Sequence, residues 1–143
     1  MLVGAGQSGL GVGRISRSVR IADLSAPSLV AVVDDDEDVR ISLEMLIGSI
    51  GHEAALFKSA DELLAFQHLG QFACFISDVQ MPGTDGIQLA RKLRRLSAAP
   101  VILITAFSSQ EVERRAYEAG VHRFMSKPFD PNALIDELEG LFG

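Results

Sequence analysis

Short apolar runs alternate with helical patterns five times after residue 28, and this alternation constrains the fold more than any other feature. The first run, Leu29–Val33, is continuous and rich in β-branched residues, which is typical of a strand buried on both faces. Four further runs span residues 54–57, 72–77, 100–105 and 122–126. Five strand–helix units in succession predict an α/β fold, with one parallel sheet and helices on both of its faces.

Capping residues and apolar residues at helical spacing delimit the predicted helices. These helices span about 37–50, 59–69, 85–96, 108–119 and 130–142. Asp36 stands where the first helix begins, and Ser59 with Glu62 three positions later matches a capping box. The helix over 108–119 is mostly polar with a thin apolar stripe, which predicts loose packing.

The first 27 residues differ in composition from the rest of the chain. Five glycines fall between positions 4 and 13, and glycine at this density makes an ordered helix or strand costly. We therefore predict a flexible tail over 1–27 and one domain over 28–143. Residues 4–9 also fit the GxGxxG fingerprint of dinucleotide sites, but that fingerprint needs a preceding strand, and only three residues precede it. The glycine-rich tail is the preferred interpretation.

Charge and hydropathy exclude several classes of partner. Residues 28–143 contain ten Lys and Arg against eighteen Asp and Glu, a net charge of −8, which argues against binding nucleic acid by bulk electrostatics. No apolar stretch approaches the roughly 20 residues of a membrane helix, and no basic segment precedes a long apolar one as in a signal peptide. We expect no membrane partner and a cytoplasmic location. The single cysteine, Cys74, lies in an apolar run, which predicts a packed, reduced thiol.

Ligands of parallel α/β sheets bind at the carboxyl ends of the strands, so the residues at those ends are the candidate site. They are Asp34, Asp35 and Asp36 after the first strand, Asp78 after the third, Thr105 at the end of the fourth and Lys127 after the fifth. Clustered carboxylates repel one another unless a cation intervenes, and oxygen ligands of this kind suit Mg²⁺. Asp can also accept a phosphoryl group covalently. Each residue alone has a plain structural explanation, such as a helix cap for Asp36, but four strand ends together indicate a phosphoryl site.

Four segments at these strand ends carry a family resemblance. They are Val-Val-Asp-Asp-Asp at 32–36, Ser-Asp-Val-Gln-Met-Pro-Gly-Thr-Asp-Gly at 77–86, Ile-Thr-Ala at 104–106 and Ser-Lys-Pro-Phe at 126–129. Their order and spacing resemble the receiver domain of bacterial two-component response regulators, with 27 positions from Asp78 to Thr105 and 22 from Thr105 to Lys127. The resemblance covers about 28–143 and implies a flavodoxin-like sheet with strand order 2-1-3-4-5.

The resemblance also implies a role for each site residue. Asp78 would be the phosphoacceptor, with Lys127 and Thr105 contacting the phosphoryl oxygens. Asp35 would bind Mg²⁺ directly and Asp34 through water, and the backbone carbonyl of Gln80 would join Asp78 in completing the ligand set. Phe124 stands at the position of an aromatic switch residue, Gln80 and Phe107 at positions that tune phosphorylation rates. The Lys127–Pro128 bond is expected to be cis.

The implied function is Mg²⁺-dependent transfer of a phosphoryl group to Asp78 from a phosphohistidine on a sensor histidine kinase or phosphotransfer protein. Such a domain signals to an output protein and is not an enzyme acting on an external substrate. The face formed by residues 108–143, with Arg114, Arg115 and Arg123, is a candidate surface for a homodimer or for the output partner. Alternatively, these arginines pair with Glu111, Glu113 and Glu118 on a solvated helix.

Three alternatives remain beside this interpretation. A Mg²⁺-dependent phosphatase with an aspartyl nucleophile would usually show Asp-x-Asp, whereas Val79 and Gln80 follow Asp78. A nucleotide-binding module would use the glycine-rich start. A receiver that signals without phosphorylation would not require the complete pocket. No output domain follows residue 143, so we expect either a stand-alone receiver or one cut from a longer chain.

Overall fold

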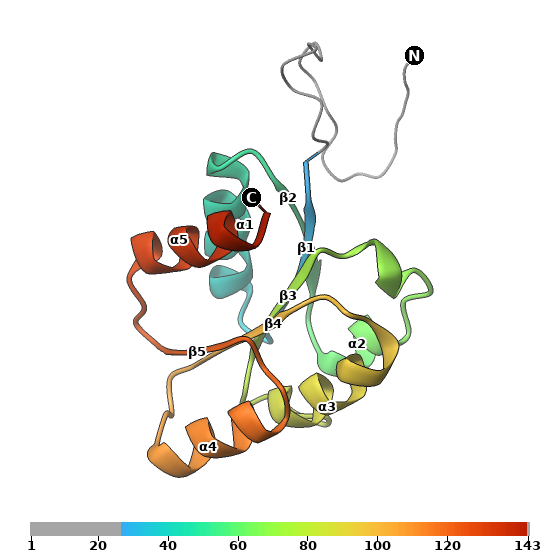
Figure 1. Ribbon diagram of the computed structural model, residues 1–143, viewed down its shortest axis with the longest axis vertical. Coiled ribbons are helices and arrows are strands. Elements are labelled where there is room, and N and C mark those ends of the chain that lie inside the picture. Colours follow the sequence, from blue (N-terminus) through green and yellow to red (C-terminus); the bar gives the residue numbers. More distant parts are fainter. Residues whose placement is uncertain (1–26, 143) are drawn as a thin grey trace.

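A computed structural model describes residues 27–142, and in it all five predicted strands pair in parallel into one sheet (Figure 1). The strands are β1 (Leu29–Val33), β2 (Glu53–Phe57), β3 (Cys74–Asp78), β4 (Val101–Thr105) and β5 (Arg123–Ser126). Their order is β2-β1-β3-β4-β5, which confirms the predicted flavodoxin-like topology.

Helices cover both faces of this sheet, as Figure 1 shows. One face carries α1 (Glu37–Ser49) and α5 (Pro131–Phe142), and the other carries α2 (Ala60–Leu64), α3 (Gly86–Leu96) and α4 (Gln110–Glu118). Alternate residues of the strands point to opposite faces, so β1 divides its apolar side chains between two cores. Ala31 and Val33 join the core under α2, α3 and α4, while Val30 and Val32 join the core under α1 and α5.

The second helix is much shorter than the predicted span 59–69. It ends at Leu64, and a single 3₁₀ turn, η3 (Leu69–Gln71), precedes β3. The ring of Phe66 lies 5.6 Å, between centroids, from the rings of both Phe57 and Phe72. Tertiary packing of this aromatic residue therefore competes with continuation of the helix, which the local sequence pattern did not reveal.

The helix caps agree with the sequence, with one correction. Asp36 and Asp85 cap α1 and α3, and Ser59 caps α2 by accepting from the Glu62 N–H at 3.0 Å. The Glu62 carboxylate, however, accepts from the N–H of Lys58 and not from that of Ser59, so the reciprocal bond of the predicted box is displaced by one residue. A complete capping box forms instead at the start of α3.

Other expectations from the sequence have different outcomes. Cys74 is fully buried, and burial raises the pKa of its thiol to about 12, which confirms a packed and unreactive side chain. Within residues 27–142, no helix has both the length and the apolar character that a membrane crossing requires. The predicted tail and its GxGxxG motif lie outside the described residues, apart from Pro27, so both stay predictions.

Candidate functional site

Parallel pairing brings the predicted site residues to one edge of the sheet. Val33, the last residue of β1, is in register with Ser77 of β3, and Thr105 of β4 is in register with Ser126 of β5. Asp34, Asp78 and Lys127, at the ends of β1, β3 and β5, therefore lie at the same edge of the sheet. The edge combines the ends of β1, β3, β4 and β5, as the strand pattern predicted.

Three carboxylates form a tight cluster at this edge. Asp34, Asp35 and Asp78 each place a carboxylate oxygen within 4.8 Å of the other two. Asp34 is buried at 2% exposure, Asp78 is half-buried and Asp35 is exposed. The cluster therefore has a closed side against the protein and an open side toward solvent, which a ligand can approach.

Lys127 supplies the positive charge of the site. Its Nζ lies 3.0 Å from Oδ2 of Asp34 and 3.6 Å from Oδ2 of Asp78, so the shorter bond is to Asp34. One ammonium faces three carboxylates, which leaves an excess of two negative charges when all are ionised. The Lys127–Pro128 peptide bond is cis, as the resemblance implied.

Burial raises the pKa of the Asp78 carboxyl above its ordinary value. The Lys127 ammonium opposes this rise, and the Asp34 carboxylate adds to it. The backbone N–H groups of Val79 and Gln80 also favour the charged form, and the Val79 N–H donates to Oδ1 of Asp78 at 2.8 Å. Loss of hydration thus outweighs the charge of Lys127 in setting the protonation of this carboxyl.

The hydrogen-bond partners of Asp34 and Asp36 separate their roles. Oδ1 of Asp34 accepts from the N–H of Asp36 at 2.9 Å, while Oδ2 faces Lys127, so both oxygens of Asp34 are engaged within the site. The Asp36 carboxylate accepts from the N–H groups of Asp38 and Val39 and caps α1. Asp36 therefore caps α1, as expected, whereas Asp34 and Asp35 belong to the carboxylate cluster.

Thr105 and Phe124 lie one step further from the carboxylates. The Thr105 side chain is fully buried, and its Oγ1 accepts from the N–H of Phe107 at 3.1 Å. Its backbone carbonyl accepts from the Lys127 N–H at 2.7 Å, which ties β4 to the lysine. Phe124 is 8% exposed and packs in the core under α2, α3 and α4. Gln80 is exposed two residues after Asp78, and the role of its carbonyl stays a prediction.

Three residues that support the site were not predicted. The Arg40 guanidinium donates to the backbone carbonyl of Asp34 at 2.7 Å, and the Ser77 hydroxyl donates to that of Asp78 at 2.8 Å. A Cβ on Gly86 would lie only 2.2 Å from the carbonyl oxygen of Asp78. The signal for Gly86 was available, because a glycine directly after the capping Asp85 is unfavourable in a helix unless close packing requires it.

The donor set of the cluster fits a divalent cation. Carboxylate oxygens on a partly open site match the preference of Mg²⁺ for hard oxygen ligands and retained water. The two uncompensated negative charges supply the electrostatic reason for such an ion. Asp34, Asp35 and Asp78 are therefore the residues that would hold it, beside a carboxylate able to act as a nucleophile.

Comparison with known proteins agrees with this geometry. Residues 30–139 match the family model described as the response regulator receiver domain. The chain is similar to nodulation protein W of Bradyrhizobium diazoefficiens, at 36% identity over 80% of this chain and 51% of that protein. It is also similar to the transcriptional regulatory protein FixJ of the same organism, at 33% identity over 77% of this chain and 54% of that protein.

A solved structure extends the agreement to the fold. The crystal structure of the Vibrio cholerae chemotaxis protein CheY4 is similar with a TM-score of 0.74 and 27% identity, over 81% of this chain and 99% of that chain. By contrast, the chain spans about half the length of the two curated relatives above. The likeness to those relatives thus concerns one part of each.

Proposed function

The chain belongs to the family of response regulator receiver domains of two-component systems, and on that premise we propose that Asp78 accepts its phosphoryl group. The single observation that carries the assignment is the cluster of Asp34, Asp35 and Asp78 beside the Lys127 ammonium. Receiver domains are phosphoacceptor signalling domains, and the matches do not favour a phosphatase.

In the proposed reaction a carboxylate oxygen of Asp78 attacks the phosphorus of a phosphohistidine in line with the leaving nitrogen. The new O–P bond forms as the N–P bond breaks, and the imidazole nitrogen keeps the bonding electron pair and takes a proton from water. The product is a mixed anhydride, which water later hydrolyses to restore the carboxylate.

Lys127 positions and neutralises the incoming group in this proposal. Its Nζ is 3.0 Å from Asp34 and 3.6 Å from Asp78, so a small movement transfers its hydrogen bonds from Asp34 to a phosphoryl oxygen near Asp78. Asp34, Asp35, Asp78 and the backbone carbonyl of Gln80 would hold a Mg²⁺ ion, which would supply further neutralisation of phosphoryl charge. With such an ion, the charge of Asp34 would stay compensated after the lysine had moved away from it.

The signal would leave the site through Thr105. In the structure the Thr105 hydroxyl oxygen accepts from the N–H of Phe107, and a phosphoryl oxygen on Asp78 would offer the hydroxyl proton of Thr105 a charged acceptor. Movement of Thr105 toward it would free space beside β5 for Phe124, whose N–H is held by the Tyr117 hydroxyl of α4 at 3.1 Å. We propose that the face over residues 108–143 thereby changes its affinity for an output protein or a second copy.

The proposal also includes partners and a location. A sensor histidine kinase or phosphotransfer protein would supply the phosphoryl group in the cytoplasm, and the domain would turn over no external substrate. Nucleic acid and membrane are not proposed as partners. Residues 1–27 would form a tail to a receiver domain that begins at residue 28.

The test is covalent labelling of the acceptor. The wild-type protein, Asp78→Asn and Asp38→Asn are incubated with acetyl phosphate and Mg²⁺, and intact mass is measured. We expect one phosphoryl adduct on wild type and on Asp38→Asn, where an exposed acid of α1 has been neutralised, and none on Asp78→Asn. Hydroxylamine should remove the adduct, as for any acyl phosphate. An adduct of equal yield on Asp78→Asn would refute the assignment.

A further inference from the structure

Helix α3 concentrates positive charge on an otherwise acidic domain. Of the ten Lys and Arg in residues 28–143, four lie in the eleven residues of α3, and the helix contains no acidic residue. They are Arg91, Lys92, Arg94 and Arg95. An even distribution over the domain would place about one of the ten there, so this helix stands out against the net charge of −8.

Most other Lys and Arg side chains of the domain form an ion pair or a hydrogen bond within the fold. Arg114 pairs with Glu111 and Glu118, and Arg123 pairs with Glu137. On α3 itself, the Arg94 side chain packs over Gly120, and its Nη1 donates weakly to the Glu118 carbonyl at the end of α4.

The other three α3 cations have no such explanation. Within residues 27–142, no carboxylate lies within ion-pair distance of Arg91, Lys92 or Arg95. All three side chains are exposed.

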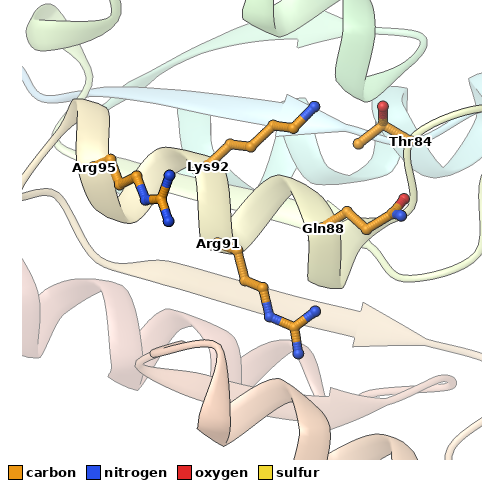
Figure 2. A pocket seen from close by; sticks show the side chains of 5 residues that line it. All are labelled: Thr84, Gln88, Arg91, Lys92 and Arg95. Carbon is orange, nitrogen blue, oxygen red and sulfur yellow. The ribbon is translucent and has the colours of Figure 1, made fainter.

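These three side chains line a shallow pocket of about 300 Å³ together with Thr84 and Gln88 (Figure 2). Figure 2 shows Arg91 and Lys92 leaving the helix toward opposite sides, with Gln88 and Thr84 toward the N-terminal end. The Gln88 side-chain oxygen accepts from the Asp85 N–H in the capping box, so its amide N–H groups remain to donate outward. The pocket thus offers donors and positive charge, and its lining includes no apolar side chain.

The shape and chemistry favour an extended acidic segment over a compact ligand. Because no apolar side chain lines the pocket, a small organic ligand would meet only the aliphatic parts of polar side chains there. From Gln88 to Arg95 the helix rises about 10 Å, which is the length of about three residues of extended peptide. Carboxylates at alternate positions of such a peptide are about 7 Å apart, near the rise of about 6 Å along the helix axis between Arg91 and Arg95.

An exposed apolar side chain lies at the end of this row. Leu96 is 56% exposed and lies four residues after Lys92, so both are on the same side of α3. A peptide that follows the row of donors can cover Leu96 with an apolar residue of its own. Double-stranded nucleic acid fits less well, because its extended phosphate charge would also face the acidic remainder of the domain.

We propose that the α3 groove, lined by Thr84, Gln88, Arg91, Lys92 and Arg95 and followed along the helix by the exposed Leu96, binds an acidic segment of a partner protein that carries an apolar residue beside its carboxylates. The evidence is charge complementarity at helical spacing next to an exposed leucine. The groove is separate from the carboxylate cluster, and this proposal does not depend on phosphorylation of Asp78.

The test uses the whole chain and fluorescein-labelled peptides, with binding followed by fluorescence anisotropy. One probe is a run of ten glutamates, and the second has a leucine added at each end. The triple variant Arg91→Gln/Lys92→Gln/Arg95→Gln should lose at least tenfold in affinity for both. The control Lys58→Gln/Arg114→Gln/Arg123→Gln removes the same charge from exposed positions elsewhere and should lose less than about threefold.

Four further readouts distinguish an acidic peptide from other possible ligands of the groove. Leu96→Ser should weaken only the leucine-flanked peptide, and added salt should weaken both peptides on the wild type. Equal losses in the two triple variants would overturn the proposal, because binding would then follow net charge alone. It would also be overturned if tripolyphosphate or a DNA duplex displaced the peptide at lower concentration than unlabelled peptide does. Self-association that depends on the α3 cations, without peptide binding, would assign the groove to a second copy instead.

Discussion

Replacing Gly86 by alanine tests whether close backbone packing fixes the position of Asp78. A Cβ at residue 86 would lie 2.2 Å from the Asp78 carbonyl oxygen and 2.9 Å from the Val79 Cα. Ordinary van der Waals contacts of a Cβ begin near 3.4 Å. The deficit of about 1.2 Å is against main-chain atoms, which cannot rotate away as a flexible side chain can, so the start of α3 must move.

The expected cost follows from what α3 carries with it. Overpacking of this kind costs about 1–3 kcal/mol, and the hydrogen bond from the Gly86 N–H to the Val79 carbonyl, now 2.8 Å, contributes about 1 kcal/mol more when strained. The better helix propensity of alanine returns at most about 1 kcal/mol. We expect the free energy of unfolding to fall by about 2–3 kcal/mol, which corresponds to a Tm lower by about 10 °C.

Gly48 provides the matched control, because it is an exposed helical glycine in α1 with nothing within 4 Å of an added Cβ. Gly48→Ala should raise the free energy of unfolding by about 0.5–1 kcal/mol through helix propensity alone. Both variants are unfolded in urea at pH 7 and followed by circular dichroism, with m-values compared to wild type. If Gly86→Ala is as stable as wild type while Gly48→Ala behaves as expected, the packing argument is wrong.

Three other predictions concern charge. Asp35→Asn should lower Mg²⁺ affinity at least tenfold in a calorimetric titration, whereas Asp36→Asn, which removes the same charge but keeps a capping side chain, should change it less than about threefold. Burial raises the pKa of Asp78 in the folded protein, so the stability of the metal-free wild type should fall as pH rises from about 4 through that pKa. Asp78→Asn should therefore be the more stable protein at pH 7. This gain in stability should disappear below about pH 4. Burial lowers the pKa of His52, although the charge of Glu139 opposes this, and the neutral Nδ1 atom accepts from the Ser28 N–H at 2.9 Å. The free energy of unfolding should therefore decline as pH falls below 6.5. His52→Gln should make that decline smaller when urea unfolding is measured at several pH values.

The sequence predicted the sheet because its signals are local and repeated. Each strand is a short apolar run, and alternate side chains of β1 fill two separate cores, so every apolar residue of the run is needed. The strand order came from the resemblance and not from periodicity, since five parallel strands with helical crossovers permit other orders. The end of α2 was missed for the opposite reason. Its termination depends on Phe66 meeting Phe57 and Phe72, which are separated from it by up to nine residues.

In the site, the positions of the residues at the strand ends could be predicted, but the contacts between their side chains could not. Placement at the carboxyl edge follows from parallel pairing, so the sequence alone could predict that Asp34, Asp78, Thr105 and Lys127 are neighbours. Which of the two carboxylates lies closer to Lys127 could not be predicted. In the structure Lys127 bonds more closely to Asp34 than to Asp78, and nothing in the spacing of these residues ranks the two carboxylates.

That ranking has a physical cause and a consequence for the proposed switch. Asp34 is almost completely buried, so an unpaired charge there would cost more than one on the half-buried Asp78, and the single lysine stabilises the fold most by serving Asp34. Asp78 is left with a raised pKa and a partly free carboxylate. A phosphoryl group on Asp78 would add negative charge on the side that Lys127 serves least, and this imbalance is what would draw the lysine and then Thr105 toward it. The arrangement of charges before phosphorylation therefore already favours movement of Lys127 and Thr105 toward Asp78.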